Sequence, residues 1–161
     1  MHVGEWTHRQ RALAPEAAMR GCENLLELGS WPRWMVGQPA MMAPSVHRPE
    51  EGMTLEVHRL LRGAPLVERW RVLKVREGEA PPFAEVLLEL EGQLRGERPA
   101  GRAFLGLQLR LTVLAEEDGG VEAAVKWAPR GLHRLLARRL RADVGNLAER
   151  WVTDLVAACD A

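Results

Sequence analysis

Three polar residues stand on strand faces that are otherwise apolar, and their side chains are the ones best suited to chemistry: His8, Arg59 and Glu68. The alternation of two neighbouring segments predicts a hairpin in which Leu61 lies opposite Leu66, so that Arg59 lies opposite Glu68. Acid, base and guanidinium groups within hydrogen-bond reach of a substrate can transfer protons. The alternative is an ion pair at the rim of the sheet, which would contribute little.

No metal or nucleophile motif accompanies these residues. Gly-x-Ser-x-Gly, His-Glu-x-x-His, Cys-x-x-Cys and P-loop patterns are all missing from the sequence. His2 and His8 on one strand would lie about 20 Å apart, too far to share a metal ion. Cys22 and Cys159 match neither a disulfide framework nor a zinc motif, which is typical of free thiols in a reducing compartment. We therefore expect no metal and no cofactor.

Tryptophan is the unusual component of this sequence, with six Trp beside two Phe and no Tyr. The periodicity places Trp6, Trp70 and Trp127 on apolar strand faces and Trp151 on the apolar stripe of a C-terminal helix. Core packing is one interpretation, since each ring buries up to about 250 Å². The other is an apolar ligand pocket with a few polar anchors. The predicted ligand-binding residues are Trp6, His8, Trp34, Val57, Arg59, Glu68, Trp70, Leu88, Leu90, Leu107, Leu109, Trp127, Leu140, Val144, Leu147 and Trp151.

A short segment concentrates two of these rings around a proline. Ser30 has the residue type of an N-cap, and Pro32 suits the first turn of a helix. In such a helix Trp34, together with Met35, is expected to face the interior more than Trp31 does. The segment is either a lid over the pocket or a fixed plug, and the sequence leaves both open.

Composition limits the partners of this chain. Its 161 residues suit a single domain spanning 1–161, and the 22 basic residues balance the 22 acidic ones. With no net charge, the chain has no overall positive electrostatic field that would attract nucleic acid. No apolar run reaches the roughly 18 residues of a membrane span, and no signal-peptide pattern is found, so a cytoplasmic protein without stable membrane insertion is expected. The basic segment 133–141 is interpreted as the wet side of a helix, with transient membrane contact as the alternative. The oligomeric state stays open.

The N-terminal region is predicted to contain a strand over residues 3–13, with Trp6 and His8 on one face, and then a helix from Pro15 to Gly29. Alternating segments from about residue 39 to 127 predict short antiparallel strands with one wet face. The loop after Glu117 should hold three or five residues. A two-residue turn would pair residues that face opposite sides of the sheet.

The C-terminal region changes to a helical period. Apolar residues from Leu132 to Cys159 form one stripe, including Leu140 and Leu147, which predicts a helix over 132–159. A sheet with one apolar face needs a cover, and only this helix is long enough. We therefore predict an α+β helix-grip fold. A curved antiparallel sheet of about six to seven strands wraps around the long helix, with two short helices after the first strand.

Two motifs support a family resemblance. Pro15-Glu16 directly follows the first strand, and Trp31-Pro32-Arg33-Trp34 lies in the second helix. In these motifs and in its element order, the chain resembles the START-like superfamily, also called SRPBCC. Its members include polyketide cyclases and aromatases, lipid and quinone carriers, and plant hormone receptors. Ala17 and Ala18 depart from the bulky aromatic that the family often has there. The resemblance implies a cavity between sheet and long helix and no universal catalytic residue.

Three functional hypotheses follow. The first is binding or transport of a hydrophobic small molecule, such as a lipid, a quinone or a polyketide-like compound, by a protein that is not an enzyme. The alternative is an aromatase- or cyclase-like enzyme that uses His8, Arg59 or Glu68 for proton transfer. A purely structural module with a filled interior is the third. Convergence of the three polar side chains inside the pocket would favour the enzyme.

Overall fold

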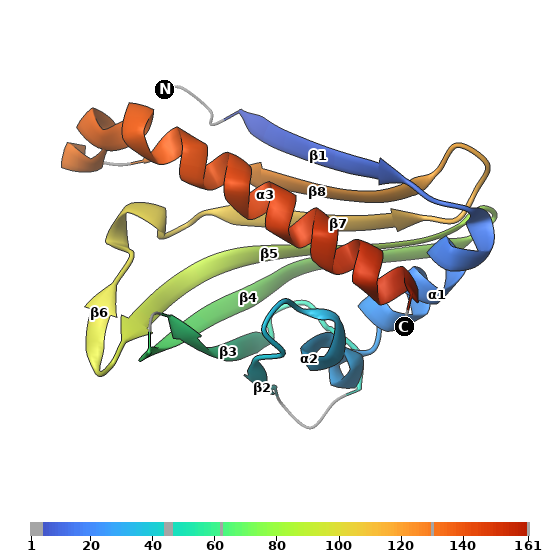
Figure 1. Ribbon diagram of the computed structural model, residues 1–161, viewed down its shortest axis with the longest axis horizontal. Helices are drawn as coiled ribbons and strands as arrows, with labels where there is room; N and C mark the ends of the chain where they lie inside the picture. Colours follow the sequence, from blue (N-terminus) through green and yellow to red (C-terminus); the bar gives the residue numbers. More distant parts are fainter. Residues whose placement is uncertain (1–4, 44–46, 62, 130, 161) are drawn as a thin grey trace.

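The computed structural model describes residues 5–43, 47–61, 63–129 and 131–160. Figure 1 shows α3 lying diagonally across one face of the sheet, with α1 beside its C-terminal end. The elements in chain order are β1 (Trp6–Ala12), α1 (Pro15–Leu25), η1 (Leu28–Ser30), α2 (Trp31–Trp34), β2 (Ala40–Met42), β3 (Thr54–Leu61), β4 (Ala64–Glu79), β5 (Pro82–Arg95), β6 (Arg98–Ala100), η2 (Arg102–Phe104), β7 (Gln108–Leu114), β8 (Gly120–Lys126), η3 (Gly131–Leu136) and α3 (Ala137–Asp160).

The strands form one antiparallel sheet in the order β1-β8-β7-β5-β4-β3-β2, with β6 paired to β5. The first and last strands of the chain are therefore neighbours, and α3 covers them and packs on α1. The predicted α+β fold is confirmed. The short strands β2 and β6 bring the sheet to eight strands, where six to seven were expected.

The central strands owe their place to alternating apolar residues. Along β5, Val86 and Leu88 are buried while Leu87 between them is only part-buried. On the neighbouring β7, Leu109 and Leu111 are likewise buried and Arg110 between them is part-buried. An apolar face of this kind has to be covered, and α3 supplies the matching apolar stripe.

The loop between β7 and β8 has the predicted length. Leu114 pairs with Gly120 and Val113 with Val121, so five residues, 115–119, lie between the strands. Both residues of the Val113–Val121 pair are buried on the same face of the sheet. The prediction from face parity is confirmed.

The hairpin between β3 and β4 has a different register from the predicted one. Leu61 pairs with Ala64, and Arg59 pairs with Leu66 rather than with Glu68. Only residues 62 and 63 separate the strands, and Gly63 has a φ of 79°, which permits so tight a turn. A shift by two residues keeps each side chain on its predicted face.

The first helix begins at Pro15 as predicted but ends at Leu25, not at Gly29. Leu28–Ser30 form a separate 3-10 turn. Ser30 already has helical dihedral angles and does not cap α2. Its Oγ instead lies 2.7 Å from the carbonyl oxygen of Asn24 and 2.8 Å from that of Glu27, which share its single O–H donor.

The long C-terminal helix begins later than the predicted residue 132. A 3-10 segment, η3, precedes the α-helix, which starts at Ala137 and continues through Gly145 to Asp160. Leu135 and Leu136 of the predicted stripe are 82% and 41% exposed. The apolar period therefore extends beyond the part of the helix that the sheet covers, because periodicity shows which residues share a face and not where the partner surface ends.

Candidate functional site

Arg59 and Glu68 form an ion pair on the face of the sheet that packs against α3. The Arg59 Nε atom donates to Glu68 Oε1 at 2.8 Å, and the side chains are 12% and 6% exposed. Because Glu68 pairs directly with Val57, the contact runs diagonally across the two strands. The two residues meet as predicted, although in the shifted register.

A β-bulge adds a third side chain to this pair. Between Arg69 and Trp70 the pairing of β4 with β5 shifts, which leaves one residue of β5 without a partner. Gln93 consequently turns to the same face as Glu68 and donates from Nε2 to Glu68 Oε2 at 3.2 Å. Strict alternation from Leu88 and Leu90 would put Leu94 on the inner face as well, but Leu94 pairs with Val67 of the outer face and is 39% exposed.

Helix α3 adds two charged residues, Arg150 and Asp154, which lie one helical turn apart. Asp154 is 2% exposed, and its Oδ1 accepts a hydrogen bond of 3.0 Å from the backbone N–H of Val36, just beyond α2. The carbonyl oxygen of Val36 accepts from Arg59 Nη1 at 3.4 Å. Val36 therefore joins α3 to β3 through its two backbone groups.

Two tryptophans from opposite layers meet close to these charges. Trp70 of β4 and Trp151 of α3 have ring centroids 6.5 Å apart in an edge-to-face arrangement. Both are almost fully buried. The Arg150 guanidinium carbon lies 5.8 Å from the centre of the Trp151 ring, within the range of a cation–π contact.

Several polar atoms in this region are buried without a hydrogen-bond partner among the described residues. They are Arg59 Nη2, Trp70 Nε1, Arg150 Nε, Arg150 Nη2, Trp151 Nε1 and Asp154 Oδ2. Buried polar groups are usually paired, because each unpaired one forfeits its hydrogen bond to water. So many of them in one region mark it as the candidate site. We call Arg59, Glu68, Trp70, Arg150, Trp151 and Asp154 the inner cluster.

Burial changes the acid–base behaviour of the inner cluster. It raises the pKa of Asp154 from 3.8 to about 6, although the Val36 hydrogen bond and the charges of Arg150 and Arg59 act in the opposite direction. It also lowers the pKa of Arg150, and the like charge of Arg59 adds to that effect. Asp154 is thus a carboxyl group that exchanges its proton close to neutral pH.

Sequence reasoning missed Gln93, Arg150 and Asp154. Gln93 required knowledge of the bulge, which alternation does not reveal. Asp154 had a detectable signal, since it lies three residues after Trp151 and four before Ala158, both of which are buried. Arg150 lies within the predicted C-terminal helix, but no sequence motif singles it out. Its position one turn before Asp154 was the only sign of its role.

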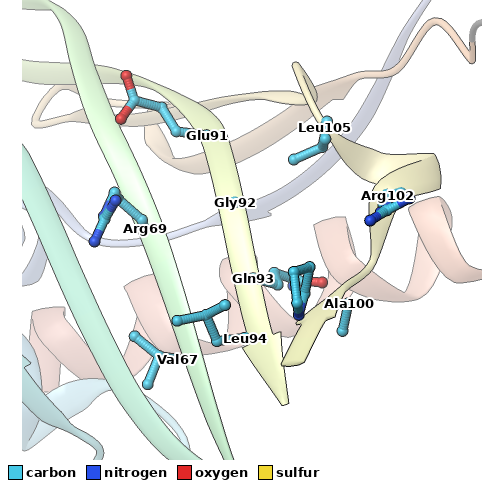
Figure 2. Close-up of a pocket in the computed structure, with 10 residues that line it drawn as sticks. Val67, Arg69, Glu91, Gly92, Gln93, Leu94, Ala100, Arg102 and Leu105 are labelled. Carbon is cyan, nitrogen blue, oxygen red and sulfur yellow. The ribbon is translucent and has the colours of Figure 1, made fainter. Parts of the chain in front are cut away.

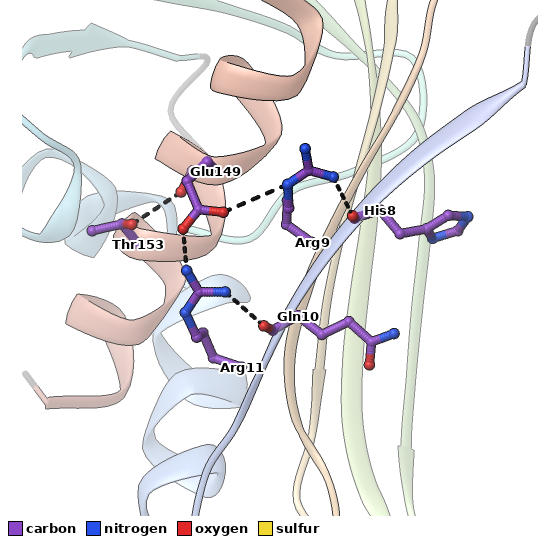
Figure 3. Close-up of polar contacts among 6 residues, drawn as sticks. All are labelled: His8, Arg9, Gln10, Arg11, Glu149 and Thr153. Atoms are coloured by element: carbon purple, nitrogen blue, oxygen red, sulfur yellow. Dashed lines mark hydrogen bonds and ion pairs between the residues drawn. The ribbon is translucent and has the colours of Figure 1, made fainter. Parts of the chain in front are cut away.

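The prediction that Trp6 and His8 face the interior is wrong. Figure 3 shows Arg9 and Arg11 reaching from β1 to Glu149 of α3, while His8 points away from the helix. His8 Nδ1 instead lies 3.3 Å from Glu122 on the outer face.

Trp6 shares that outer face. The Arg110 guanidinium lies 4.7 Å from the centre of its ring. The prediction failed because β1 carries polar residues on both faces. Long arginine side chains can border a helix as well as water, so alternation alone did not show which face is inner.

Most of the predicted apolar lining residues are buried between sheet and helix. The buried ones are Trp34, Val57, Trp70, Leu88, Leu90, Leu107, Leu109, Val144 and Trp151. Trp127, Leu140 and Leu147 are part-buried. Trp127 packs on Phe104 with ring centroids 5.6 Å apart and donates from Nε1 to the carbonyl oxygen of Ala103 at 2.7 Å.

The two tryptophans around Pro32 both pack into the core. Trp31 and Trp34 are 1% and 4% exposed, and their ring centroids lie 5.4 Å apart. Trp31 Nε1 donates to the carbonyl oxygen of Leu25 at 3.0 Å, and Trp34 Nε1 donates to Ser30 Oγ at 3.1 Å. The expected contrast, with Trp34 inside and Trp31 at an open side, is therefore not seen.

A pocket of about 380 Å³ lies where the first residues of β4 pair with the last residues of β5, next to β6. It does not lie within the inner cluster. Figure 2 shows it between the strands and the loop that carries Arg102 and Leu105. Its strand residues include Val67 and Arg69, which alternate with the inward-facing Glu68. This pocket is distinct from the region between sheet and α3 where a cavity was expected.

Comparisons with known proteins find the fold but no sequence relative. No family model matches the chain, and no curated protein matches it. A hypothetical protein from Helicobacter pylori has a TM-score of 0.63 at 11% identity, over 96% of this chain and 88% of that chain. The major latex-like protein 151 from Panax ginseng has a TM-score of 0.61 at 6% identity, over 99% and 95%. Ara h 8.0201 has a TM-score of 0.58 at 9% identity, over 95% of each chain. The chain shares the helix-grip fold of these proteins.

The fold predicted from sequence is thereby confirmed over almost the whole chain. At such low identities the likeness concerns the helix-grip architecture alone. Among the helices in the described part of the chain, none is both long and apolar enough to span a membrane.

Proposed function

We propose that this helix-grip protein binds or transports a hydrophobic small molecule between its sheet and α3, and that it is not an enzyme. The apolar surfaces of both layers would surround the apolar part of such a molecule. Lipids, quinones and polyketide-like compounds have the required character. Residues from both layers, including Val57, Leu88, Leu109 and Val144, would line the site.

The observation that carries this proposal is the meeting of Trp70 with Trp151. Each ring is almost completely buried, and each indole N–H has no partner among the described residues. Buried tryptophans that serve packing alone usually donate this N–H to a protein acceptor, as Trp31 and Trp34 do here. Two indole N–H groups without acceptors, side by side in an apolar region, are what a binding site would offer to a hydrophobic ligand that carries a polar group.

Access would require movement of the segment around α2. This helix has only four residues, and Val36 at its end is held to α3 and β3 through the two hydrogen bonds described above. We propose that displacement of Trp34 opens the interior. Opening would have to break the two Val36 hydrogen bonds and expose the buried Trp34 ring, so the open form would be a minor population in the absence of a ligand.

Native mass spectrometry of the protein purified from its own host tests the proposal directly. A retained hydrophobic molecule of defined mass is the expected result. Titration with Nile red, a neutral fluorescent probe, gives a second measurement. A protein that retains no molecule and binds no neutral hydrophobic probe would instead be a structural module with a filled interior.

One observation favours the alternative of an aromatase- or cyclase-like enzyme. The buried Arg59–Glu68 pair lies near Asp154, whose pKa of about 6 suits proton transfer at neutral pH. His8, the third group expected to take part, lies on the opposite face of the sheet. Incubation with a poly-β-ketone thioester would distinguish the two functions. An enzyme would form cyclised product at a rate that falls in Asp154→Asn, whereas a carrier would return the substrate unchanged.

A further inference from the structure

The unpaired atoms of the inner cluster are mostly hydrogen-bond donors. Five of the six atoms without partners are nitrogens of Arg59, Trp70, Arg150 and Trp151, and only Asp154 Oδ2 is an acceptor. An arginine guanidinium and an indole N–H can donate but cannot accept. The described part of the chain therefore leaves this region with more donors than it can pair by itself.

The carboxylates in the region do not relieve this excess. Glu68 accepts from Arg59 through one oxygen and from Gln93 through the other. One oxygen of Asp154 accepts from the backbone of Val36. Arg150 is near enough to Asp154, Glu68 and Arg59 for their charges to affect it, yet its Nε and Nη2 have no hydrogen-bond partner among the described residues.

We propose that Arg150, with the indole N–H groups of Trp70 and Trp151, binds the carboxylate of an amphipathic ligand. This inference rests on the proposed function and names the chemical class of the molecule bound. A carboxylate offers about four acceptor positions on two oxygens, which suits a guanidinium and two further donors. Arg59 Nη2 can supply one more donor, while Arg59 Nε stays with Glu68.

A monoanion suits the charge balance better than a phosphate dianion does. The inner cluster contains two guanidinium groups and two carboxyl groups, so a single added negative charge is offset when Asp154 takes up one proton. Burial already raises the pKa of Asp154 to about 6, and a nearby ligand carboxylate would raise it further. Binding should therefore strengthen as the pH falls from about 8 to about 6, while the carboxylate of the ligand stays ionised.

The test compares dodecanoic acid with 1-dodecanol, which differ only in the polar group. Isothermal titration calorimetry near pH 7 should show the acid binding about tenfold more tightly or better, because charged hydrogen bonds are stronger than neutral ones. Arg150→Gln should remove this preference and leave the affinity for the alcohol within about twofold. Arg139→Gln, an exposed change on the same helix, should leave both affinities unchanged.

A second variant keeps the test independent of how Arg150→Gln folds. Trp151→Phe retains an aromatic ring but lacks the N–H group, so it should lower the affinity for the acid more than that for the alcohol. Equal affinities of acid and alcohol, unaffected in ratio by either variant, would overturn the carboxylate site and leave the proposed function standing. If neither molecule nor Nile red binds, the proposed function fails and this inference fails with it.

Discussion

The backbone N–H of Val36 donates to Asp154 Oδ1 at 3.0 Å, and this bond fixes the segment just after α2 to the C-terminal half of α3. Asp154, which receives the bond, is 2% exposed. One buried acid thus links the segment that covers the interior to the helix that the sheet surrounds. The protonation state of Asp154 therefore affects the free energy of unfolding.

The free energy of unfolding should depend on pH through Asp154. Its pKa in the folded protein, about 6, exceeds the ordinary value of 3.8, so the folded state holds this proton more tightly than the unfolded state does. The stabilisation is fully present below about pH 4 and is lost as the pH rises through about 6, by on the order of 1–3 kcal/mol. Arg150, Arg59 and the Val36 N–H face this carboxyl and limit the effect.

Denaturant unfolding of the wild type and Asp154→Asn at a series of pH values measures this contribution. The difference between the two proteins removes the effect of all other carboxylates. A difference that stays constant between about pH 4 and 8 would show that Asp154 titrates normally in the folded protein.

Glu68→Gln should destabilise the protein by about 3 kcal/mol, because it leaves the buried Arg59 guanidinium without its counter-charge. The double variant Arg59→Met/Glu68→Leu should lose less, since no charge then remains unpaired at that position. A double-mutant cycle from urea melts, with Arg59→Met and Glu68→Leu as its two single variants, measures the coupling. If the two single changes simply add, the ion pair contributes no coupling energy to the stability of the fold.

Leu155→Ala should cost about 2–5 kcal/mol, because Leu155 is fully buried on the face of α3 that meets the core. Leu140→Ala should cost clearly less, since Leu140 is only part-buried near the start of the helix. Thermal or urea unfolding of the two matched variants provides the comparison. Equal losses at both positions would contradict the observed end of the covered stripe.

Trp34→Ala should weaken the binding of Nile red by on the order of 1–3 kcal/mol, the scale for one buried apolar side chain. Trp31→Ala is the matched control from the same helical turn, and both variants should lower the melting temperature because both rings are buried. Fluorescence titration beside a denaturant melt separates the two effects. Unchanged probe affinity in a strongly destabilised Trp34→Ala would identify α2 as a fixed plug.

Cys22 and Cys159 should react slowly with thiol reagents in the folded protein. Both are buried and free, and burial raises the pKa of each from 9.0 to about 11, so little thiolate exists at about pH 8. Colorimetric thiol titration should detect both groups only after denaturant is added. Rapid modification of either cysteine without denaturant would indicate that α1 separates from α3 in the native protein.

The local patterns were sufficient for the architecture. Alternation along β5 and β7, Pro15 at a helix start and the C-terminal stripe each reflect a rule that acts within a few neighbouring residues. These rules agree on one layer arrangement, because an apolar sheet face and one long apolar helix leave a single way to bury both. The parity argument predicted an odd loop of three or five residues after β7, and the structure has five.

The chemistry of the interior was decided by contacts between distant segments. A bulge in β5 places Gln93 on the inner face. The register of the β3–β4 hairpin places Arg59 diagonally across from Glu68 instead of directly opposite it. The pairing of β1 with β8 places Trp6 and His8 on the outer face. Alternation shows that a strand has two faces, but where both carry polar residues only the neighbouring element determines which one is inner. Asp154 and Val36, 118 positions apart in sequence, meet because α3 and the end of α2 pack together. Such a meeting depends on tertiary packing and leaves no periodic signal in the sequence.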